Sequence, residues 1–448
     1  MYVRTVEGSG TDPLDCDEDG DPRAPDDEGP AVASLAAGLR ERVRAGRALF
    51  DRPLTSYYLI GGITALLIML GLVMVLSTGS VMNLSQGLSP YSDFEHQLLG
   101  VLVGVPVMWV AARSSPRLFR AAAYPLLAVA VIGLGLTLIH GVGVSQNTGA
   151  ARWIQLGSFQ FQPSEVAKLA LALWGADLLA RKEKLGLLAD WRHMLVPLLP
   201  GTAVLVLLVM VGDDLGTSSI LLIIFLALVW IAGTPGRVFG AMLILMGLVM
   251  LLLIVTSQYR LARFTDFFDS QNTNPLGANM QAIQGKWALG SGGIFGVGIG
   301  AGKAKWNWVP QDTSDFIFAI IGEELGLVGT LCVTALYGGL AFAGLRVARR
   351  APDTFSRLAA AAITAWIVMQ AVVNIGAVIG VLPITGVPLP LVSYGLSSVL
   401  VTMVALGMLM AFARREPGAR EALAARGPDV GSRVLSWVGL GARHADGP

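Results

Sequence analysis

Ten apolar segments of membrane-spanning length dominate this 448-residue sequence and restrict the folds that it can adopt. A transmembrane helix needs about 20 consecutive, mostly apolar residues. The segments lie at about 57–77, 97–112, 121–139, 164–180, 194–211, 216–233, 237–256, 315–345, 357–381 and 397–413. Charged residues make up only 14% of the chain, whereas soluble domains contain about 25%. The sequence therefore predicts an all-α, polytopic membrane protein with ten transmembrane helices.

Basic residues gather in every second connection between these predicted helices. They precede the first helix and follow the second, fourth, sixth, eighth and tenth: Arg40, Arg42, Arg44, Arg47, Arg52, Arg113, Arg117, Arg120, Arg181, Lys182, Lys184, Arg192, Arg237, Arg346, Arg349, Arg350, Arg414 and Arg415. Loops rich in Lys and Arg face the cytoplasm in membrane proteins. We therefore expect a multi-pass protein of the cytoplasmic membrane with both termini in the cytoplasm.

The two ends of the chain differ in composition from its apolar middle. Residues 1–30 contain ten acidic side chains and few aromatics, a composition that is typical of disordered segments. We divide the chain into a cytoplasmic head (1–52) that is disordered and acidic and then Arg-rich, a ten-helix membrane domain (53–415), and a cytoplasmic tail (416–448).

The longest connection, residues 257–314, is expected on the extracytoplasmic side and leads directly into Asp315. Its candidate site residues are five cations and one amide: Arg260, Arg263, Lys286, Lys303, Lys305 and Gln281. A carboxylate at an outer helix start, near cations, is suited to general-base chemistry on a membrane-anchored substrate. The alternative for Asp315 is a helix N-cap, a position that Asp often fills.

Two further groups of ionisable residues lie close to predicted helices. Glu165 and Lys168 are three residues apart and so share a helix face. Charges at this depth are functional candidates, and the alternative is an internal ion pair that locks helix packing. Asp213 and Asp214 could hold a divalent cation, but a structural role at a helix start is favoured.

The glycine-rich segment 290–300 suggests a nucleotide-binding loop but does not fit one. Lys303 is followed by Ala304, and Val297 stands where the first glycine of a P-loop belongs. Backbone amides of this segment could instead bind a phosphate of an external, lipid-linked substrate.

Five stretches together resemble the SEDS proteins (shape, elongation, division and sporulation), in the order found in that family. They are Arg152–Lys168, Asp214–Thr217, Ala288–Gly302, Asp315–Gly326 and Asn374–Ser398. The resemblance covers about residues 57–415 and is greater to the actinobacterial division members than to the elongation members. It implies a SEDS-type fold of ten helices.

The resemblance also implies an activity: a peptidoglycan glycosyltransferase that polymerises lipid II on the outer face of the membrane during cell division. Asp315 matches the family's catalytic aspartate and is expected to act as the general base of an inverting displacement with undecaprenyl pyrophosphate as leaving group. Cations would offset the charge of that leaving group, with a divalent cation such as Mg²⁺ or Mn²⁺ as a further candidate but no metal ligand assigned. Candidate substrate-binding residues are Arg152, Glu165, Lys168, Arg260, Arg263, Gln281, Lys286, Lys303, Lys305, Ser393 and Ser397.

In such a family the expected partners are lipid II, a class B penicillin-binding protein transpeptidase and other divisome membrane proteins; we expect no nucleic-acid partner. The alternatives are a flippase or transporter of lipid II, an elongation polymerase, and a non-catalytic scaffold. A flippase needs polar groups through both leaflets, whereas the charges here cluster toward the outer side, which favours the polymerase.

Three positions depart from the pattern of the family. Residues 310–315 lack the usual Glu and His, Gly212 and Asp213 replace a Gln-Pro pair, and Leu396 replaces a glycine. None of these changes removes Asp315, so we expect the activity to be retained.

Overall fold

The structure, a computed structural model, describes residues 53–85, 87–139, 143–144, 152–156, 159–268, 280–306, 309 and 313–425. The predicted head (1–52) and the part of the tail beyond residue 425 lie outside the described residues. The helices are α2 (Thr55–Ser85), α3 (Ser92–Arg113), α4 (Pro116–Thr137), α5 (Pro163–Lys184), α6 (Trp191–Leu195), α7 (Leu198–Val211), α8 (Leu215–Ile231), α9 (Gly236–Val255), α10 (Gln258–Phe268), α11 (Met280–Ser291), α12 (Ile317–Arg350), α13 (Thr354–Val378), α14 (Leu396–Ala413) and α15 (Ala419–Ala425), with a 3₁₀ turn at Leu187–Ala189.

Each of the ten predicted apolar segments contains a helix. Among the described residues, eight helical segments are long and apolar enough to cross a membrane. Of the other two, α8 is shorter, and α5 carries Glu165, Lys168 and Asp177 among its buried residues. The prediction of an all-α, multi-pass membrane protein is confirmed.

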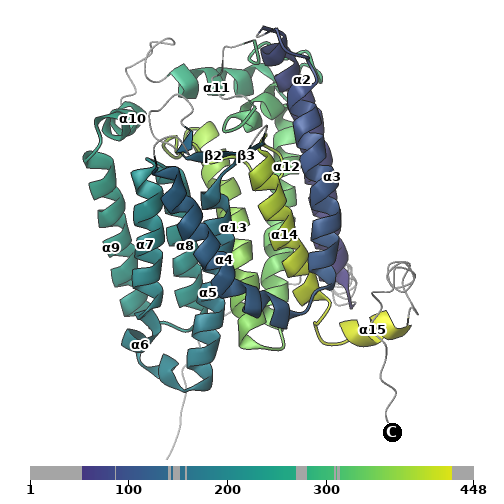
Figure 1. Ribbon diagram of the computed structural model, residues 1–448. Helices are drawn as coiled ribbons and strands as arrows, with labels where there is room; N and C mark the ends of the chain where they lie inside the picture. The colour runs from purple at the N-terminus through teal and green to yellow at the C-terminus, as the bar shows by residue number, and fades with distance from the viewer. Residues whose placement is uncertain are drawn as a thin grey trace, which may run out of the picture. The chain divides into compact units, whose positions relative to one another are not determined.

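A small antiparallel sheet, which the sequence did not predict, precedes α5. It consists of β1 (Gly143–Val144), β2 (Trp153–Leu156) and β3 (Phe159–Phe161) in the order β1-β2-β3. Ile154 pairs with Phe161 in its register. The sheet lies at the end of the helix bundle where α5 begins (Figure 1), so that Arg152 is held next to the turn between α7 and α8.

The long helices run side by side (Figure 1), and α13 lies in contact with α5, α8 and α12. α14 packs most extensively on α3, and α2 contacts α3, α12 and α14. α9 differs from these helices because none of its residues is buried, and its main neighbours are α8 and α10. Its apolar surface is suited to contact with lipid.

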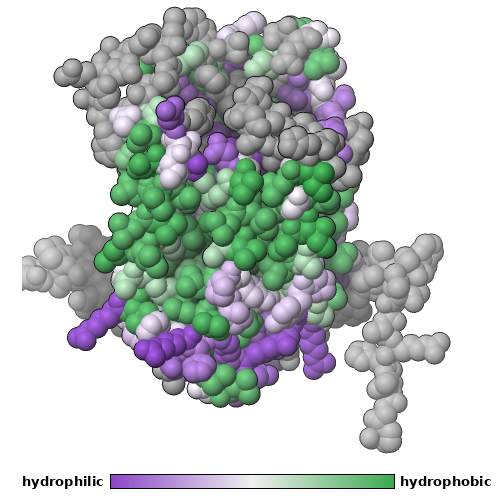
Figure 2. Space-filling view, turned by 60° about the vertical axis from the view of Figure 1, so that its left-hand side comes forward, coloured by the Kyte–Doolittle hydropathy of each residue, from purple (hydrophilic) through white to green (hydrophobic). Residues whose placement is uncertain are grey.

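The basic connections predicted from the sequence come together at one end of the bundle. We call it the basic end, and it comprises the ends of α3, α5, α12 and α14 and the starts of α4 and α9. Figure 2 shows one face of the molecule, where apolar side chains form a belt above this hydrophilic rim. An apolar belt next to a charged rim is the surface expected of a protein that spans a bilayer.

The helix predicted from Asp315 onward is not continuous. Gly326 in α12 has φ 68° and ψ −163°, which breaks the helix into two pieces. The break leaves carbonyl and amide groups without partners in the helix. The loop of residues 292–298 forms hydrogen bonds with these groups.

Candidate active site

A pocket with a volume of about 670 Å³ lies at the end of the bundle opposite the basic end. It is bordered by β2, the start of α5, the turn between α7 and α8, α10, and the segments before α12 and α14. Four of the predicted site residues line it: Arg152, Glu165, Arg260 and Asp315. The pocket therefore combines a candidate base with two guanidinium groups.

Asp315 lies in a turn that immediately precedes α12. The N-cap position of α12 is Phe316, which makes no side-chain capping bond, so Asp315 lies one residue before the cap. Asn374 of α13 donates from Nδ2 to the carbonyl oxygens of Asp315 and Val387, both at 2.7 Å. Asn374 thus ties the backbone of the candidate base to the loop between α13 and α14.

The same turn is held from its other side by residues 393–395. Ser393 Oγ donates to the Ser314 carbonyl at 2.6 Å, and the Tyr394 N–H donates to the Thr313 carbonyl at 2.9 Å. Gln97 of α3, which is 1% exposed, holds this segment with two bonds. Its Nε2 donates to the Ser393 carbonyl at 3.2 Å, and its Oε1 accepts from the Gly395 N–H at 3.1 Å. The predicted Ser393 does not line the pocket, and its hydroxyl group holds the turn that precedes α12.

Sequence reasoning missed Gln97. The only signal for it was one amide side chain at the start of an apolar segment, and a buried amide of this kind needs hydrogen-bond partners that only the fold can supply.

Tyr394 lines the pocket as a neutral phenol. Burial raises the pKa of Tyr394 to about 12, and the negative charge of Asp93 adds to the effect. The hydroxyl group therefore stays protonated at physiological pH.

The two arginines of the pocket reach it from different elements and meet at the turn between α7 and α8. Arg152 donates from Nε to the Gly212 carbonyl at 2.9 Å and from Nη2 to the Asp213 carbonyl at 2.7 Å. Arg260 of α10 lies 3.4 Å from the Asp213 carboxylate. The backbone of Asp213 is in the left-handed region, with a φ of 57°. The charge that the departure from Gln-Pro introduces is thus paired with an arginine of the long connection.

Asp214 has the structural role that the sequence favoured. It is the N-cap of α8, accepting from the Thr217 N–H at 2.9 Å and from Thr217 Oγ1 at 2.7 Å. The other departure, Leu396, lies against Gly100 of α3, where an added Cβ would be 3.4 Å from Leu396 Cγ. The small residue in α3 accommodates the larger side chain.

Glu165, which lines the pocket, belongs to a buried ion pair. Lys168 Nζ lies 2.8 Å from Glu165 Oε1, and the two side chains are 1% and 2% exposed. Lys168 also donates to Gln370 Oε1 at 2.9 Å, and Gln370 Nε2 donates to the Pro388 carbonyl at 2.9 Å. Glu165 Oε2 has no hydrogen-bond partner among the described residues. Glu165 lines the pocket whereas Lys168 does not, so a functional role for Glu165 stays a prediction.

The three lysines of the long connection lie away from this pocket. Lys286 of α11 is exposed, and its Nζ would be 2.5 Å from a Cβ added at Gly380. Lys303 is also exposed, and its backbone N–H donates to Glu323 Oε1 at 2.8 Å. Lys305 is buried (4% exposed) and pairs with Glu324 at 3.0 Å.

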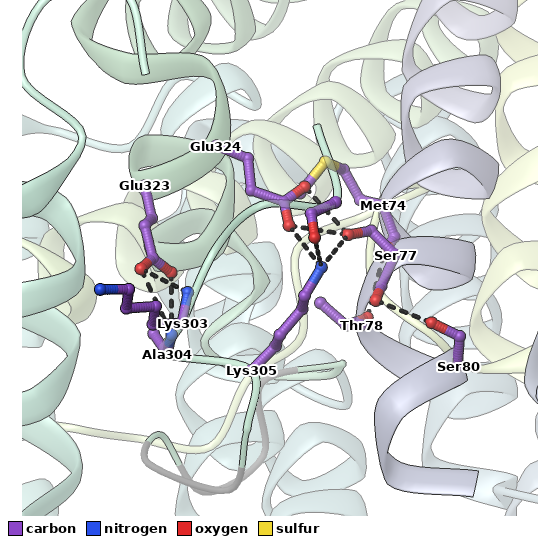
Figure 3. Close-up of polar contacts among 10 residues, drawn as sticks. Met74, Ser77, Thr78, Ser80, Lys303, Ala304, Lys305, Glu323 and Glu324 are labelled. Atoms are coloured by element: carbon purple, nitrogen blue, oxygen red, sulfur yellow. Dashed lines mark hydrogen bonds and ion pairs between the residues drawn. The ribbon is translucent and has the colours of Figure 1, made fainter. Parts of the chain in front are cut away.

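Figure 3 shows the cluster around this buried lysine. Lys305 Nζ donates to Ser77 Oγ at 3.0 Å and to the Gly300 carbonyl at 2.7 Å, while Ser77 Oγ donates to Glu324 Oε1 at 2.7 Å. Ser77 belongs to α2 and Glu324 to α12. The cluster therefore joins α2, α12 and the glycine-rich loop. Its charged and hydroxyl groups form hydrogen bonds with one another.

The glycine-rich loop uses its backbone amides within the protein. The N–H groups of Val297 and Gly298 donate to the carbonyls of Glu323 and Glu324, both at 3.0 Å. In return, Leu327 N–H donates to the Gly293 carbonyl at 3.0 Å. These bonds satisfy the break in α12 at Gly326, so the amides of Val297 and Gly298 are already engaged within the protein.

The remaining candidates lie outside the described pocket lining. Gln281 of α11 is 9% exposed, and Ser397 of α14 is 2% exposed, with no hydrogen-bond partner for its Oγ among the described residues. Arg263 lies in α10, but its side chain is outside the described part of the chain.

The donors of the pocket do not form a metal site in the part of the chain that the structure describes. No group of three His, Cys, Asp or Glu side chains there is close enough to hold an ion. Glu165 and Asp214 already accept from Lys168 and Thr217.

Comparisons with known proteins agree with this geometry. The sequence model of the cell cycle protein family FtsW/RodA/SpoVE matches residues 58–417. The probable peptidoglycan glycosyltransferase FtsW of Mycobacterium tuberculosis is 43% identical over 409 residues, which cover 91% of this chain and 77% of that protein. Stage V sporulation protein E of Bacillus subtilis is 34% identical over 354 residues, covering 79% of this chain and 95% of that protein.

Solved structures show the same fold. A chain from a study of how a peptidoglycan synthase complex coordinates polymerization and crosslinking superposes with a TM-score of 0.65 at 28% identity, covering 80% of this chain and 98% of that chain. The rod shape determining protein RodA of Thermus thermophilus has a TM-score of 0.57 at 27% identity, covering 82% of this chain and 98% of its own. The chain belongs to the FtsW/RodA/SpoVE family of membrane proteins.

Proposed function

We propose that this protein is a peptidoglycan glycosyltransferase that polymerises lipid II into glycan strands for the cell wall during cell division. The observation that carries the proposal is the presence of Asp315, Arg152 and Arg260 in one pocket at the end of the bundle opposite the basic end. The curated name of the Mycobacterium tuberculosis relative, probable peptidoglycan glycosyltransferase FtsW, supports it.

In the proposed reaction, the carboxylate of Asp315 accepts the proton of the acceptor sugar's 4-hydroxyl group. The oxygen then forms a bond to the anomeric carbon of the donor, and the bond from that carbon to undecaprenyl pyrophosphate breaks with inversion. Arg152 and Arg260 offset the charge that grows on the leaving pyrophosphate, which is the type of electrostatic stabilisation that contributes most to many enzymes. Asn374 and Ser393 keep the turn of Asp315 in place and thereby orient the base.

The charge distribution supports an orientation with the basic end in the cytoplasm. In that orientation the pocket opens at the outer leaflet, and the head (1–52) and tail (416–448) are both cytoplasmic. Residues 53–415 then form the membrane domain.

A class B penicillin-binding protein transpeptidase is the proposed partner, together with other membrane proteins of the divisome. The similarity to a chain from a peptidoglycan synthase complex in which polymerization and crosslinking are coordinated supports a partner of this kind. A fluorescent fusion that gathers at midcell would support the division role, whereas a signal spread along the side wall would favour the alternative, an elongation polymerase.

The interior of α5 argues against the flippase alternative. Between Lys168 and Asp177, which lies nearer the basic end, every residue of the helix is buried and none is charged: Leu169, Ala170, Leu171, Ala172, Leu173, Trp174, Gly175 and Ala176. A lipid-linked sugar that crosses both leaflets needs polar groups along its path, and these side chains offer none.

The role of the pocket cations can be tested with Arg260. We expect Arg260→Gln to lower kcat for lipid II polymerisation by about 10²-fold, because a charge that stabilises the leaving group is lost. Arg260→Lys should retain part of the activity, and Arg237→Gln at the basic end should retain all of it. Equal rates for the wild type and Arg260→Gln would remove this residue from the mechanism.

A further inference from the structure

A second pocket, of about 340 Å³, lies at the basic end between α4, α5 and the start of α13. Four cationic side chains line it, from three parts of the chain: Arg117 and Arg120 of α4, Lys184 of α5, and Arg415 after α14. This pocket plays no part in the proposed reaction, because it lies at the opposite end of the bundle from Asp315.

The carboxylates near the pocket are already engaged. Asp353, the only acidic residue in the described lining, is the N-cap of α13 and accepts from the Ser356 N–H at 3.0 Å and from Ser356 Oγ at 2.8 Å. Asp177, which is fully buried, lies 2.8 Å from Arg120 and 2.7 Å from Arg181. One buried carboxylate is thus shared between two arginines.

Positive charge therefore remains in excess in this pocket. Arg117 and Lys184 have no ion-pair partner among the described residues, and both are exposed. The nearby Glu183 lies 3.3 Å from Arg357 instead.

Phe355 borders the pocket but is only 1% exposed, and the guanidinium of Arg120 lies 5.3 Å from the centroid of its ring. A phosphate-bearing headgroup in this pocket would therefore contact the cations and not the ring. Basic pockets between transmembrane helices on the cytoplasmic side are typical sites for such headgroups.

We propose that this pocket is a binding site for a phosphate ester, supplied by the headgroup of an anionic phospholipid in the cytoplasmic leaflet. Arg117, Lys184 and Arg415 bind the phosphate. The site depends on the proposed orientation of the chain but not on the proposed reaction, so its test reads out binding and not polymerisation.

The test measures binding of phosphatidylglycerol to the full-length protein in detergent micelles by native mass spectrometry, with phosphatidylcholine as the neutral comparison. Micelles remove the general attraction of a charged leaflet. We expect the variant Arg117→Gln with Lys184→Gln to bind phosphatidylglycerol about 30-fold more weakly than the wild type, or ~5-fold per cation. The matched control, Arg192→Gln with Arg237→Gln, changes two cations of the basic end outside the pocket and should bind as the wild type does.

Competition with glycerol phosphate identifies the source of the ligand. Displacement of phosphatidylglycerol only by another anionic lipid supports the lipid headgroup. Displacement by glycerol phosphate at similar concentration supports the phosphate-ester site and assigns it to a soluble phosphate. Equal losses in the pocket variant and the control, or equal binding of phosphatidylcholine, would overturn the proposal; unchanged helical circular dichroism would show that each variant is folded.

Discussion

The buried pair below the pocket gives a prediction whose size follows from its environment. Lys168→Met removes the charge that lies 2.8 Å from Glu165, together with the bond to Gln370 at 2.9 Å. Glu165 is 1% exposed and Oε2 has no other partner among the described residues, so its negative charge would be left buried and unpaired. Breaking a buried pair in this way costs about 3–5 kcal/mol.

The measurement is the free energy of unfolding in mixed micelles titrated with SDS. Lys184→Met, an exposed cation on the same helix, should change that free energy by less than about 0.5 kcal/mol. Adding Glu165→Gln to Lys168→Met should restore most of the loss, because the unpaired charge is gone. A cost for Lys168→Met below about 1 kcal/mol, the range of exposed pairs, would refute the reasoning that this pair is shielded from water.

Two further predictions concern the backbone around the site. Asn374→Leu removes both hydrogen bonds that hold the Asp315 and Val387 carbonyls, so kcat for polymerisation should fall by about 10²-fold. Retained binding of lipid II would show that the pocket persists in this variant. An unchanged kcat would exclude a positioning role for Asn374. Gly296→Ala places a Cβ 2.2 Å from the Glu324 carbonyl at a φ of +80°, and should lower the thermal midpoint well beyond Gly300→Ala. The latter shares the positive φ but has open space, so equal shifts would argue against the close approach.

The apolar segments made the helices predictable, because spanning length in a bilayer is set by the thickness of the hydrocarbon core. The break at Gly326 was not predictable from the apolar pattern, which continues through it. It exists because the glycine-rich loop supplies hydrogen bonds to both sides of the break. Pairing of this kind between distant segments has no local signal in one sequence.

The site was predictable in part. Four candidates line the same pocket: Asp315, Arg152, Arg260 and Glu165. They were predictable because they are charged residues on segments at one end of the apolar helices. Lys303 and Lys305 were grouped with Asp315 because they lie close to it in sequence. In the fold their segment turns back toward Glu323 and Glu324, and that direction depends on a long-range ion pair and backbone bonds.

The most direct test of the account is polymerisation of purified lipid II by the detergent-solubilised protein, alone and with its cognate transpeptidase, comparing the wild type with Asp315→Asn. The substitution keeps the size of the side chain and removes its ability to accept a proton as a base. The account predicts glycan strands from the wild type and none from an Asp315→Asn protein that unfolds at the same temperature. Strands of equal length and rate from both proteins would contradict the assignment of Asp315 as the general base.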